Sequence, residues 1–356
     1  FPGQGGQPQT VELGSPEINT QQLQLGKPIY SRRIDRAQEV AARSLELQRL
    51  TRRVLMRAVD VAARQAVYAV LRAEQLAEVA QQRATAVAAH LDLSKKLRDA
   101  GVVAKFEVVQ AETELARAQG DVIAARTAVE TARAALRRVL NLPQDTRVEV
   151  RRGAPVEPPP GDQAALIATA WEARPEVQTG QAAVSLAEAS LRLARATSDL
   201  TVNLAGGVTR TRASFGSEPT SWQVAVAAEL PILDGRAERS AEESAAAKLE
   251  SAKAELEKTR QQIALEVTQQ YLTVQEARER LRVAEQGVVE AEERLRIAKV
   301  RYENGIALGI EVLDAETALA AARAEVINSQ YSLDLAITEL RSSVGLWVGE
   351  AGGEPR

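Results

Sequence analysis

The stretch GIALGIEVLDAETAL, residues 305–319, closely matches an earlier stretch of the same chain, GVVAKFEVVQAETEL, residues 101–115. A second match joins KPIYSRRIDRA, residues 27–37, to LPILDGRAERS, residues 230–240. The offset between the copies is 204 residues in the first match and 203 in the second. An offset this constant indicates a duplicated fold unit. The two copies cover about residues 19–141 and 221–345.

The composition of the 356 residues favours long helices. Aromatic residues make up only 3 % of the chain, and the dominant small and straight-chain residues favour helices that pack closely. The net charge is −3, and no basic face carries interleaved aromatics, which argues against a nucleic-acid partner. The chain has no cysteine, so disulfides, thiolate metal sites and cysteine nucleophiles are excluded.

Two pairs of long helices are predicted, and each pair is joined by a turn at a repeated glycine. The first pair covers about residues 35–98 and 104–140, and the second about residues 236–302 and 308–344. In the second pair, apolar residues recur every seven positions, which predicts left-handed supercoiling against a partner helix. These residues are Val267, Val274, Leu281, Val288, Leu295 and Tyr302.

Strand-like alternation occurs in three segments. In residues 18–31, apolar and polar residues alternate weakly. The clearer alternation in residues 201–213 and 221–233 predicts a β-hairpin. No run of 18 apolar residues exists, so no membrane-spanning helix is predicted. An apolar sheet face can point outward in lipid, but three strands cannot close a barrel within one chain, so closure requires several chains. The predicted lipid-facing residues are Val202, Leu204, Trp222, Val224 and Val226.

The predicted fold class is mainly α with a small β part: duplicated long helical hairpins forming an α-barrel, plus strands contributing to an oligomeric membrane β-barrel. The first copy lacks the helix and strand that precede the matching strand of the second copy, so we expect both to lie upstream of Phe1. The chain divides into a loop with the first strand (1–34), the first helical hairpin (35–141), a Pro-rich linker (142–162), one helix (163–198), a membrane β-hairpin (199–234), the second helical hairpin (235–345) and a tail (346–356).

Catalytic chemistry finds little support in the sequence. The only histidine, His90, has no cysteine or histidine companion, which favours a surface or packing role. Paired glycines occur without a G-x-G-x-x-G or P-loop pattern. Acidic pairs such as Glu242–Glu243 stand among arginines and lysines, as on a solvated helix face. We therefore predict no catalytic residue, no metal site and no cofactor.

The duplicated order of elements resembles the TolC-like outer-membrane efflux factors, the outer membrane efflux protein family. The matching phrases are RPEV at 174–177, ELPILDG at 229–235 and YENGIALGIEVLDAETAL at 302–319, and the likeness covers about residues 19–345. It implies a homotrimer in the outer membrane of a Gram-negative-type bacterium, with a twelve-stranded barrel in outer-membrane lipid and a periplasmic helical tunnel. It places the N-terminal loop outside the cell and the Pro-rich linker at the equator of the tunnel.

The resemblance also implies a function. The trimer would be the passive exit duct of a tripartite efflux or type I secretion system, supplied by a periplasmic adaptor protein and an inner-membrane pump. In that family the two helix turns form the periplasmic tip, where the adaptor docks and the tunnel narrows. Carried to this sequence, the docking tip is Gly101, Val102, Val103 and Ala104 with Gly305, Ile306, Ala307 and Leu308, and the constriction is Tyr302, Glu107, Glu311 and Asp314.

Two departures from the family pattern leave the closure network and the class of adaptor open. Ala307 stands where some members carry a basic residue that locks the closed state, and no serine follows the turn glycines. The three acids also have two interpretations. They supply up to nine carboxylates to the lumen of a trimer, or they pair with Lys105 and neighbouring arginines on the outer surface.

Two other classes of function remain as alternatives. One is a soluble periplasmic coiled-coil scaffold that docks partner helical hairpins, and the other is an enzyme with an unrecognised site. The strand pattern distinguishes the scaffold from the duct, because a scaffold has no use for apolar side chains such as Val224 that face outward.

Overall fold

A computed structural model of the chain describes residues 18–153, 156–213, 220–232 and 235–346. The predicted loop over residues 1–17 and the predicted tail after residue 346 lie outside these ranges. The chain divides into two compact units. One unit comprises residues 1–47 and 182–254, and the other comprises residues 48–181 and 255–356.

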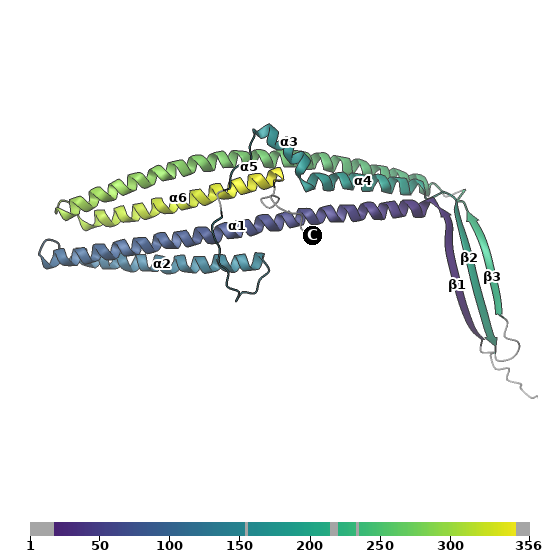
Figure 1. Ribbon diagram of the computed structural model, residues 1–356, viewed down its shortest axis with the longest axis horizontal. Helices are drawn as coiled ribbons and strands as arrows, with labels where there is room; N and C mark the ends of the chain where they lie inside the picture. The colour runs from purple at the N-terminus through teal and green to yellow at the C-terminus, as the bar shows by residue number, and fades with distance from the viewer. Residues whose placement is uncertain (1–17, 154–155, 214–219, 233–234, 347–356) are drawn as a thin grey trace, which may run out of the picture. The chain divides into compact units, whose positions relative to one another are not determined.

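Long helices dominate the described residues, and a small sheet accompanies them (Figure 1). The predicted class, mainly α with a small β part, is therefore confirmed. None of these helices combines the length and the apolarity needed to cross a membrane. The elements are β1 (Ile18–Ser31), α1 (Arg32–Asp99), α2 (Lys105–Val139), α3 (Gln163–Ala173), α4 (Pro175–Arg195), β2 (Thr201–Ala213), β3 (Thr220–Glu229), α5 (Ala237–Glu303) and α6 (Gly309–Val344).

The single helix predicted over residues 163–198 is two helices, α3 and α4. Asp162 caps the start of α3, because its side chain accepts a hydrogen bond from the backbone N–H of Ala165 at 2.9 Å. The break falls at Arg174, whose ψ of 128° is extended. Pro175 explains the break, since proline disfavours the helical conformation in the residue before it and is well suited to begin a new helix. The prediction of one helix was wrong because it ignored this proline.

The two copies of the repeat agree in their backbone hydrogen bonds. At the turn after each long helix, the N–H of Val102 bonds to the carbonyl of Leu97 at 2.9 Å, and the N–H of Ile306 bonds to that of Arg301 at 2.8 Å. At the end of each return helix, Leu142 bonds to Arg137 and Leu346 to Arg341, both at 2.9 Å. All these pairs are related by the same offset, so residue-by-residue equivalence holds at both ends of the return helices.

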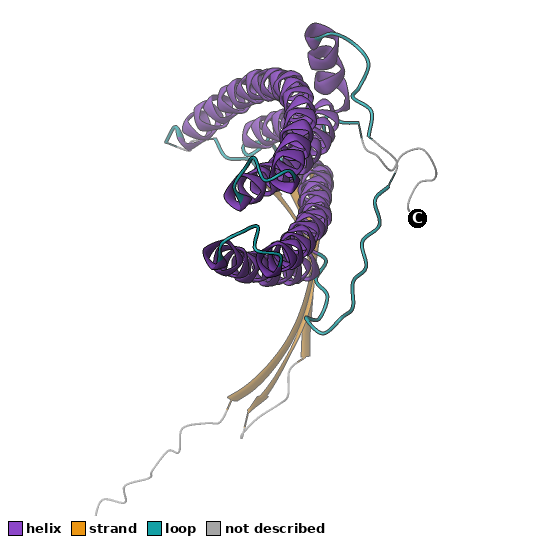
Figure 2. Cartoon of the chain, turned by 90° about the vertical axis from the view of Figure 1, so that its left-hand side faces the viewer, coloured by secondary structure: helices purple, strands orange, loops and turns teal. Residues whose placement is uncertain are grey.

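The three strands, drawn in orange in Figure 2, form one antiparallel sheet. Their order in the sheet is β1-β2-β3. Val226 lies opposite Leu204, and Trp222 lies opposite Val208. Directly opposed residues of an antiparallel pair point to the same face. One face of the sheet is therefore apolar, as the alternation in the sequence predicted. In the same unit, α4 is tied to both long helices, since Arg192 pairs with Glu39 at 2.8 Å and Arg195 with Glu242 at 2.7 Å.

The seam along α5 follows the predicted seven-residue period, with a second set of small residues beside it. Val267, Val274, Leu295 and Tyr302 are buried, whereas Leu281 and Val288 are only half-buried. A coiled coil has two core positions in each heptad. The second position is filled by alanines, which the sequence pattern did not single out and which let the helices approach closely: Ala277, Ala284, Ala291 and Ala298 are all buried.

Candidate functional site

The two turns that join the paired helices are built alike. Gly101 and Gly305 have φ values of 78° and 69°, which glycine adopts without strain. The residues that begin the return helices, at N-cap positions Ala104 and Leu308, have matching extended backbones and no side-chain cap. Val102, Ile306 and Leu308 are exposed, so both turns present apolar side chains to their surroundings. Of the remaining predicted tip residues, Val103 and Ala307 are half-buried.

Near these turns, α1 meets α5 through a buried polar cluster. The hydroxyl oxygens of Ser94 and Tyr302 are 3.1 Å apart, and Nε2 of His90 is 3.5 Å from the Ser94 hydroxyl. The rings of His90 and Tyr302 pack with centroids 5.1 Å apart. The lone histidine thus has the packing role that was one of its two predicted interpretations. The sequence did not predict its contact with Tyr302.

Glu107 and Gly309 complete this cluster from α2 and α6. A Cβ atom at Gly309 would lie 3.1 Å from Oε2 of Glu107 and 3.3 Å from Nε2 of His90. Glycine at this position therefore lets α6 approach the two polar side chains. Oε2 of Glu107 is buried and makes no hydrogen bond of standard geometry within the described residues, although the Glu107 carboxylate is close enough to the Tyr302 phenol to raise its pKa. We call His90, Ser94, Glu107, Tyr302 and Gly309 the tip cluster.

Burial and neighbouring charges set the protonation of the tip cluster. Burial lowers the pKa of His90, and Lys299 lowers it further, while Glu316 opposes both. Lys299 and Glu316 form an ion pair at 2.7 Å, with the Glu316 side chain almost fully buried. Burial raises the pKa of the Tyr302 phenol, and the Glu107 carboxylate raises it further against the effect of the Ser94 hydrogen bond. Both rings are therefore held neutral at pH 7.

The three predicted constriction acids have different surroundings. Glu107 faces Tyr302 inside the tip cluster. Glu311 forms an ion pair with Arg301 at 3.1 Å, and both side chains are partly exposed. Asp314 is exposed. Among the predicted constriction residues, Glu107 and Tyr302 are thus brought together, whereas Glu311 is engaged with a cation on its own hairpin.

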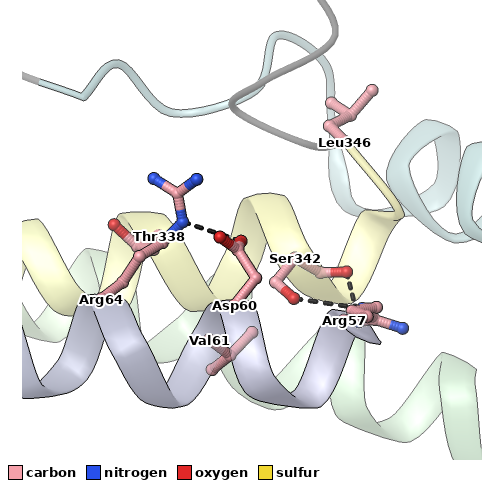
Figure 3. A pocket seen from close by; sticks show the side chains of 7 residues that line it. All are labelled: Arg57, Asp60, Val61, Arg64, Thr338, Ser342 and Leu346. Carbon is pink, nitrogen blue, oxygen red and sulfur yellow. Dashed lines mark hydrogen bonds and ion pairs between the residues drawn. The ribbon is translucent and has the colours of Figure 1, made fainter. Parts of the chain in front are cut away.

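A second buried polar cluster joins α1 to α4, α5 and α6. Arg57 donates hydrogen bonds to the hydroxyl and the carbonyl oxygen of Ser342 (Figure 3). Arg57 also donates a hydrogen bond to Glu176 at 2.6 Å. Arg174 donates to both carboxylate oxygens of Glu176, at 3.1 and 3.0 Å, and to Glu266 at 2.7 Å. We call Arg57, Arg174, Glu176, Glu266 and Ser342 the arginine cluster. It explains the RPEV phrase, whose Arg174 and Glu176 both contribute.

Three groups of the arginine cluster, Arg57, Arg174 and Glu176, remain ionised despite burial. Burial lowers the pKa of Arg57, and the neighbouring Arg174 lowers it further. Burial tends to lower the pKa of Arg174, but the hydrogen bonds that it donates to Glu176 and Glu266 outweigh burial and raise this pKa. Burial tends to raise the pKa of Glu176, but Arg174 and Arg57 outweigh it, so this pKa is below its ordinary value of 4.5. Glu176 is thus the carboxylate that the two guanidinium groups share.

The predicted lipid-facing side chains are uncovered in the sheet. Val224 and Val226 are each 66 % exposed, and Trp222 and Leu204 are also exposed. Val202 is half-buried. Every residue of β3 is exposed. None of the apolar core clusters found in the described residues includes a strand residue, so no helix packs over this face.

A candidate metal site is not found in the described parts of the chain. No group of three or more His, Asp or Glu side chains there could hold a metal ion. The two buried polar clusters both join the first helical hairpin to the second. Both consist of hydrogen-bonded or ion-paired side chains that hold helices of the two hairpins together, which suits a mechanical role.

Comparison with known proteins agrees with this architecture. Residues 166–346, just over half of the chain, match the family model described as outer membrane efflux protein. No curated protein sequence gives a significant match.

Solved structures give the same fold. A membrane protein from Pseudomonas aeruginosa is similar with a TM-score of 0.75 at 19 % identity, covering 93 % of this chain and 84 % of that one. The outer-membrane channel OprN is similar with a TM-score of 0.74 at 19 % identity, covering 93 % of this chain and 81 % of that one. The open state of the MtrE outer membrane channel from Neisseria gonorrhoeae is similar with a TM-score of 0.74 at 18 % identity, covering 93 % of this chain and 81 % of that one.

The family match and the shared fold settle the class of protein. The family is one of channel proteins and not of enzymes, and membership locates the chain in the outer membrane with its long helices in the periplasm. The chain therefore belongs to the outer membrane efflux protein family and is an outer-membrane efflux channel protein.

Proposed function

We propose that three copies of the chain form the exit duct of a tripartite efflux or type I secretion system. The uncovered apolar face of the sheet carries this proposal. Three strands leave two unpaired edges, and lipid tolerates no unpaired backbone edge. Pooling the strands of several copies closes the sheet and places Val224 and Val226 against lipid.

The helical hairpins continue the duct into the periplasm in this proposal. An inner-membrane pump and a periplasmic adaptor protein deliver the substrate, and the duct conducts it passively. The adaptor docks at the two turns, where Val102, Ile306 and Leu308 are exposed and offer an apolar contact surface. The tip cluster and the nearby acids Glu311 and Asp314 form the constriction at this end.

The test is conductance in a planar lipid bilayer, combined with paired substitutions in β3. Val224→Arg places a charge on the proposed lipid face and is expected to cost about 2–4 kcal/mol near the bilayer midplane, which blocks membrane assembly. Ala225→Arg is the matched control, because neighbouring strand residues point to opposite faces. We expect the control to insert and conduct. Equal behaviour of the two variants, or a stable monomer in detergent, would contradict the proposal.

A further inference from the structure

We propose that the cavity between α1, α6 and the segment joining α2 to α3 binds an organic anion. Arg151 and Arg341 hold its carboxylate or phosphate group, and its apolar body lies against α1. The cavity has a volume of about 670 Å³, which is within the range of small-molecule sites in proteins. All of its lining residues belong to the compact unit of residues 48–181 and 255–356. The site shares no residue with the tip cluster or the arginine cluster and goes beyond the proposed function.

One wall of the cavity is apolar and comes from α1. Ala63, Val67 and Leu71 line it, and their spacing of four residues places them on one face of the helix. Leu71 is buried, whereas Ala63 and Val67 are only half-buried. Val156, from the segment between α2 and α3, also lines the cavity and is half-buried. The apolar body of a ligand would therefore cover side chains that the chain itself leaves partly open.

Positive charge is in excess around the cavity. Four arginines and two acidic residues line it, so the positive charges outnumber the negative ones by two. Two of the arginines are already engaged. Arg64 pairs with Asp60 of its own helix at 2.8 Å. Arg152 pairs with Asp334 at 3.4 Å and stacks over the ring of Tyr331 with its guanidinium carbon 5.6 Å from the centroid.

The other two arginines, Arg151 and Arg341, lack such partners. Within the described ranges, neither forms an ion pair, and the exposed Glu157 side chain pairs with neither of them. Arg341 donates a hydrogen bond from Nη1 to the backbone carbonyl of Glu157 at 3.0 Å. Its Nε atom is buried and has no hydrogen-bond partner among the described residues.

The chemistry of these two arginines identifies the class of ligand. A buried donor without an acceptor costs stability, and the missing acceptor at Arg341 is what an anionic oxygen would supply. A guanidinium group presents its donors in a planar fork that fits a carboxylate or a phosphate. Two unpaired guanidinium groups beside an apolar wall therefore select an anion that carries an apolar body over one that is polar throughout.

The first experiment measures binding of 1-naphthyl phosphate to the full protein by isothermal titration calorimetry. A fixed concentration of non-ionic detergent makes partition into micelles the same for every variant. We expect one bound molecule per chain, and a Kd that Arg151→Gln weakens about tenfold or more, because a charged hydrogen bond is lost. The matched control is Arg147→Gln, which removes the same charge from the same segment. Arg147 does not line the cavity and pairs with Glu149 at 3.0 Å, so the Kd should not change.

Two results of this experiment would overturn the inference. One is the absence of binding to the wild-type protein at millimolar ligand. The other is an equal Kd for Arg151→Gln and Arg147→Gln, since a difference in net charge alone would then explain the affinity. Neither measurement depends on conductance or on the number of copies, so either failure leaves the proposed function standing.

A second experiment separates the charged half of the site from the apolar half. Inorganic phosphate alone and 1-naphthol alone should each bind at least about tenfold more weakly than 1-naphthyl phosphate. Val67→Trp fills the space beside α1 and should abolish binding of 1-naphthyl phosphate, with circular dichroism confirming that the variant is folded. Inorganic phosphate that binds as tightly as the naphthyl ester would overturn the apolar half, and 1-naphthol that binds as tightly would overturn the charged half. If Val67→Trp does not fold, the comparison of Arg151→Gln with Arg147→Gln still decides the matter.

Discussion

The tip cluster and the arginine cluster both join the first repeat to the second, but they use opposite chemistry. In the arginine cluster, each buried cation has a carboxylate at 2.6–3.1 Å. In the tip cluster, buried neutral rings surround a carboxylate oxygen that lacks a partner. Removing one partner of a buried ion pair leaves the other charge unpaired at a large cost, and a buried polar atom without a partner also costs stability. The hairpins are thus joined by paired charges in the arginine cluster and by an incompletely satisfied set of polar groups in the tip cluster.

The largest expected effect comes from removing the shared carboxylate of the arginine cluster. Glu176→Gln leaves Arg57 and Arg174 buried without their common counter-charge, and breaking a buried pair in this way costs about 3–5 kcal/mol. Thermal unfolding followed by circular dichroism measures the loss. The control is Glu255→Gln on the exposed face of α5, where the pair with Lys258 is open to solvent and the melting temperature should not change. A melting temperature of Glu176→Gln equal to that of the control would mean that the arginine cluster is not held together by charge.

A smaller effect is expected from crowding the tip cluster. Gly309→Ala places a methyl group 3.1 Å from the Glu107 oxygen and 3.3 Å from His90, and overpacking of this kind costs about 1–3 kcal/mol. Gly120→Ala in α2 is the matched control, since nothing lies within 4 Å of its Cβ position and alanine favours a helix interior. The free energy of unfolding, measured with denaturant, should therefore be lower for Gly309→Ala and unchanged or higher for Gly120→Ala. The opposite order would show that the tip cluster has spare room.

These two clusters differ in how far the sequence predicted them. The repeat, the long helices and the β-hairpin were predicted from repeated sequence stretches and from the periodicity of apolar residues. Both signals can be detected in a single sequence. Tyr302 was expected at the tip, and its position in a seven-residue period is enough to place it on the helix seam. The contacts of His90 and Ser94 with it were not predicted, because they depend on how two hairpins more than 200 residues apart approach each other.

The arginine cluster shows a different limit of sequence reasoning. In the sequence, the RPEV motif at Arg174 served only as evidence of the resemblance to the efflux family. Its partner Arg57 is one of many arginines on α1, and no spacing distinguishes it from the solvated ones. The proline within the phrase did carry a signal, since it ends one helix and begins another, but the predicted continuous helix passed over it. Local rules can thus locate a break, whereas long-range ion pairs need the fold.

A third prediction concerns the hydrogen bond that closes the tip cluster. Tyr302→Phe removes the hydroxyl that contacts Ser94 at 3.1 Å and should cost about 0.5–1.5 kcal/mol of unfolding free energy. It also removes the phenol whose pKa the Glu107 carboxylate raises, and at the proposed constriction this loss should make the variant duct open more often in single-channel recordings. Tyr271→Phe is the control, because Tyr271 is half-buried against the apolar core and makes no hydrogen bond within the described residues. Identical recordings from the two variants would remove Tyr302 from the gate.

The smallest expected effect is a difference in pH response between the two clusters. The pKa of His90 is lowered from its ordinary value of 6.5 by burial, so the unfolded chain binds a proton at a higher pH than the folded tip does. Stability of the tip is therefore fully present above pH 6.5 and declines as the pH falls below it. The pKa of Glu176 is lowered from 4.5, so the stability that it contributes persists until the pH falls below that value.

Hydrogen exchange, corrected for the intrinsic pH dependence, should show the tip cluster losing protection first on acidification, while the arginine cluster remains protected. Because His90 is the only histidine, its titration can be followed directly by NMR, and His90→Gln should abolish the early loss. A His90 pKa at or above 6.5 would refute the buried neutral ring and, with it, the contrast between the clusters.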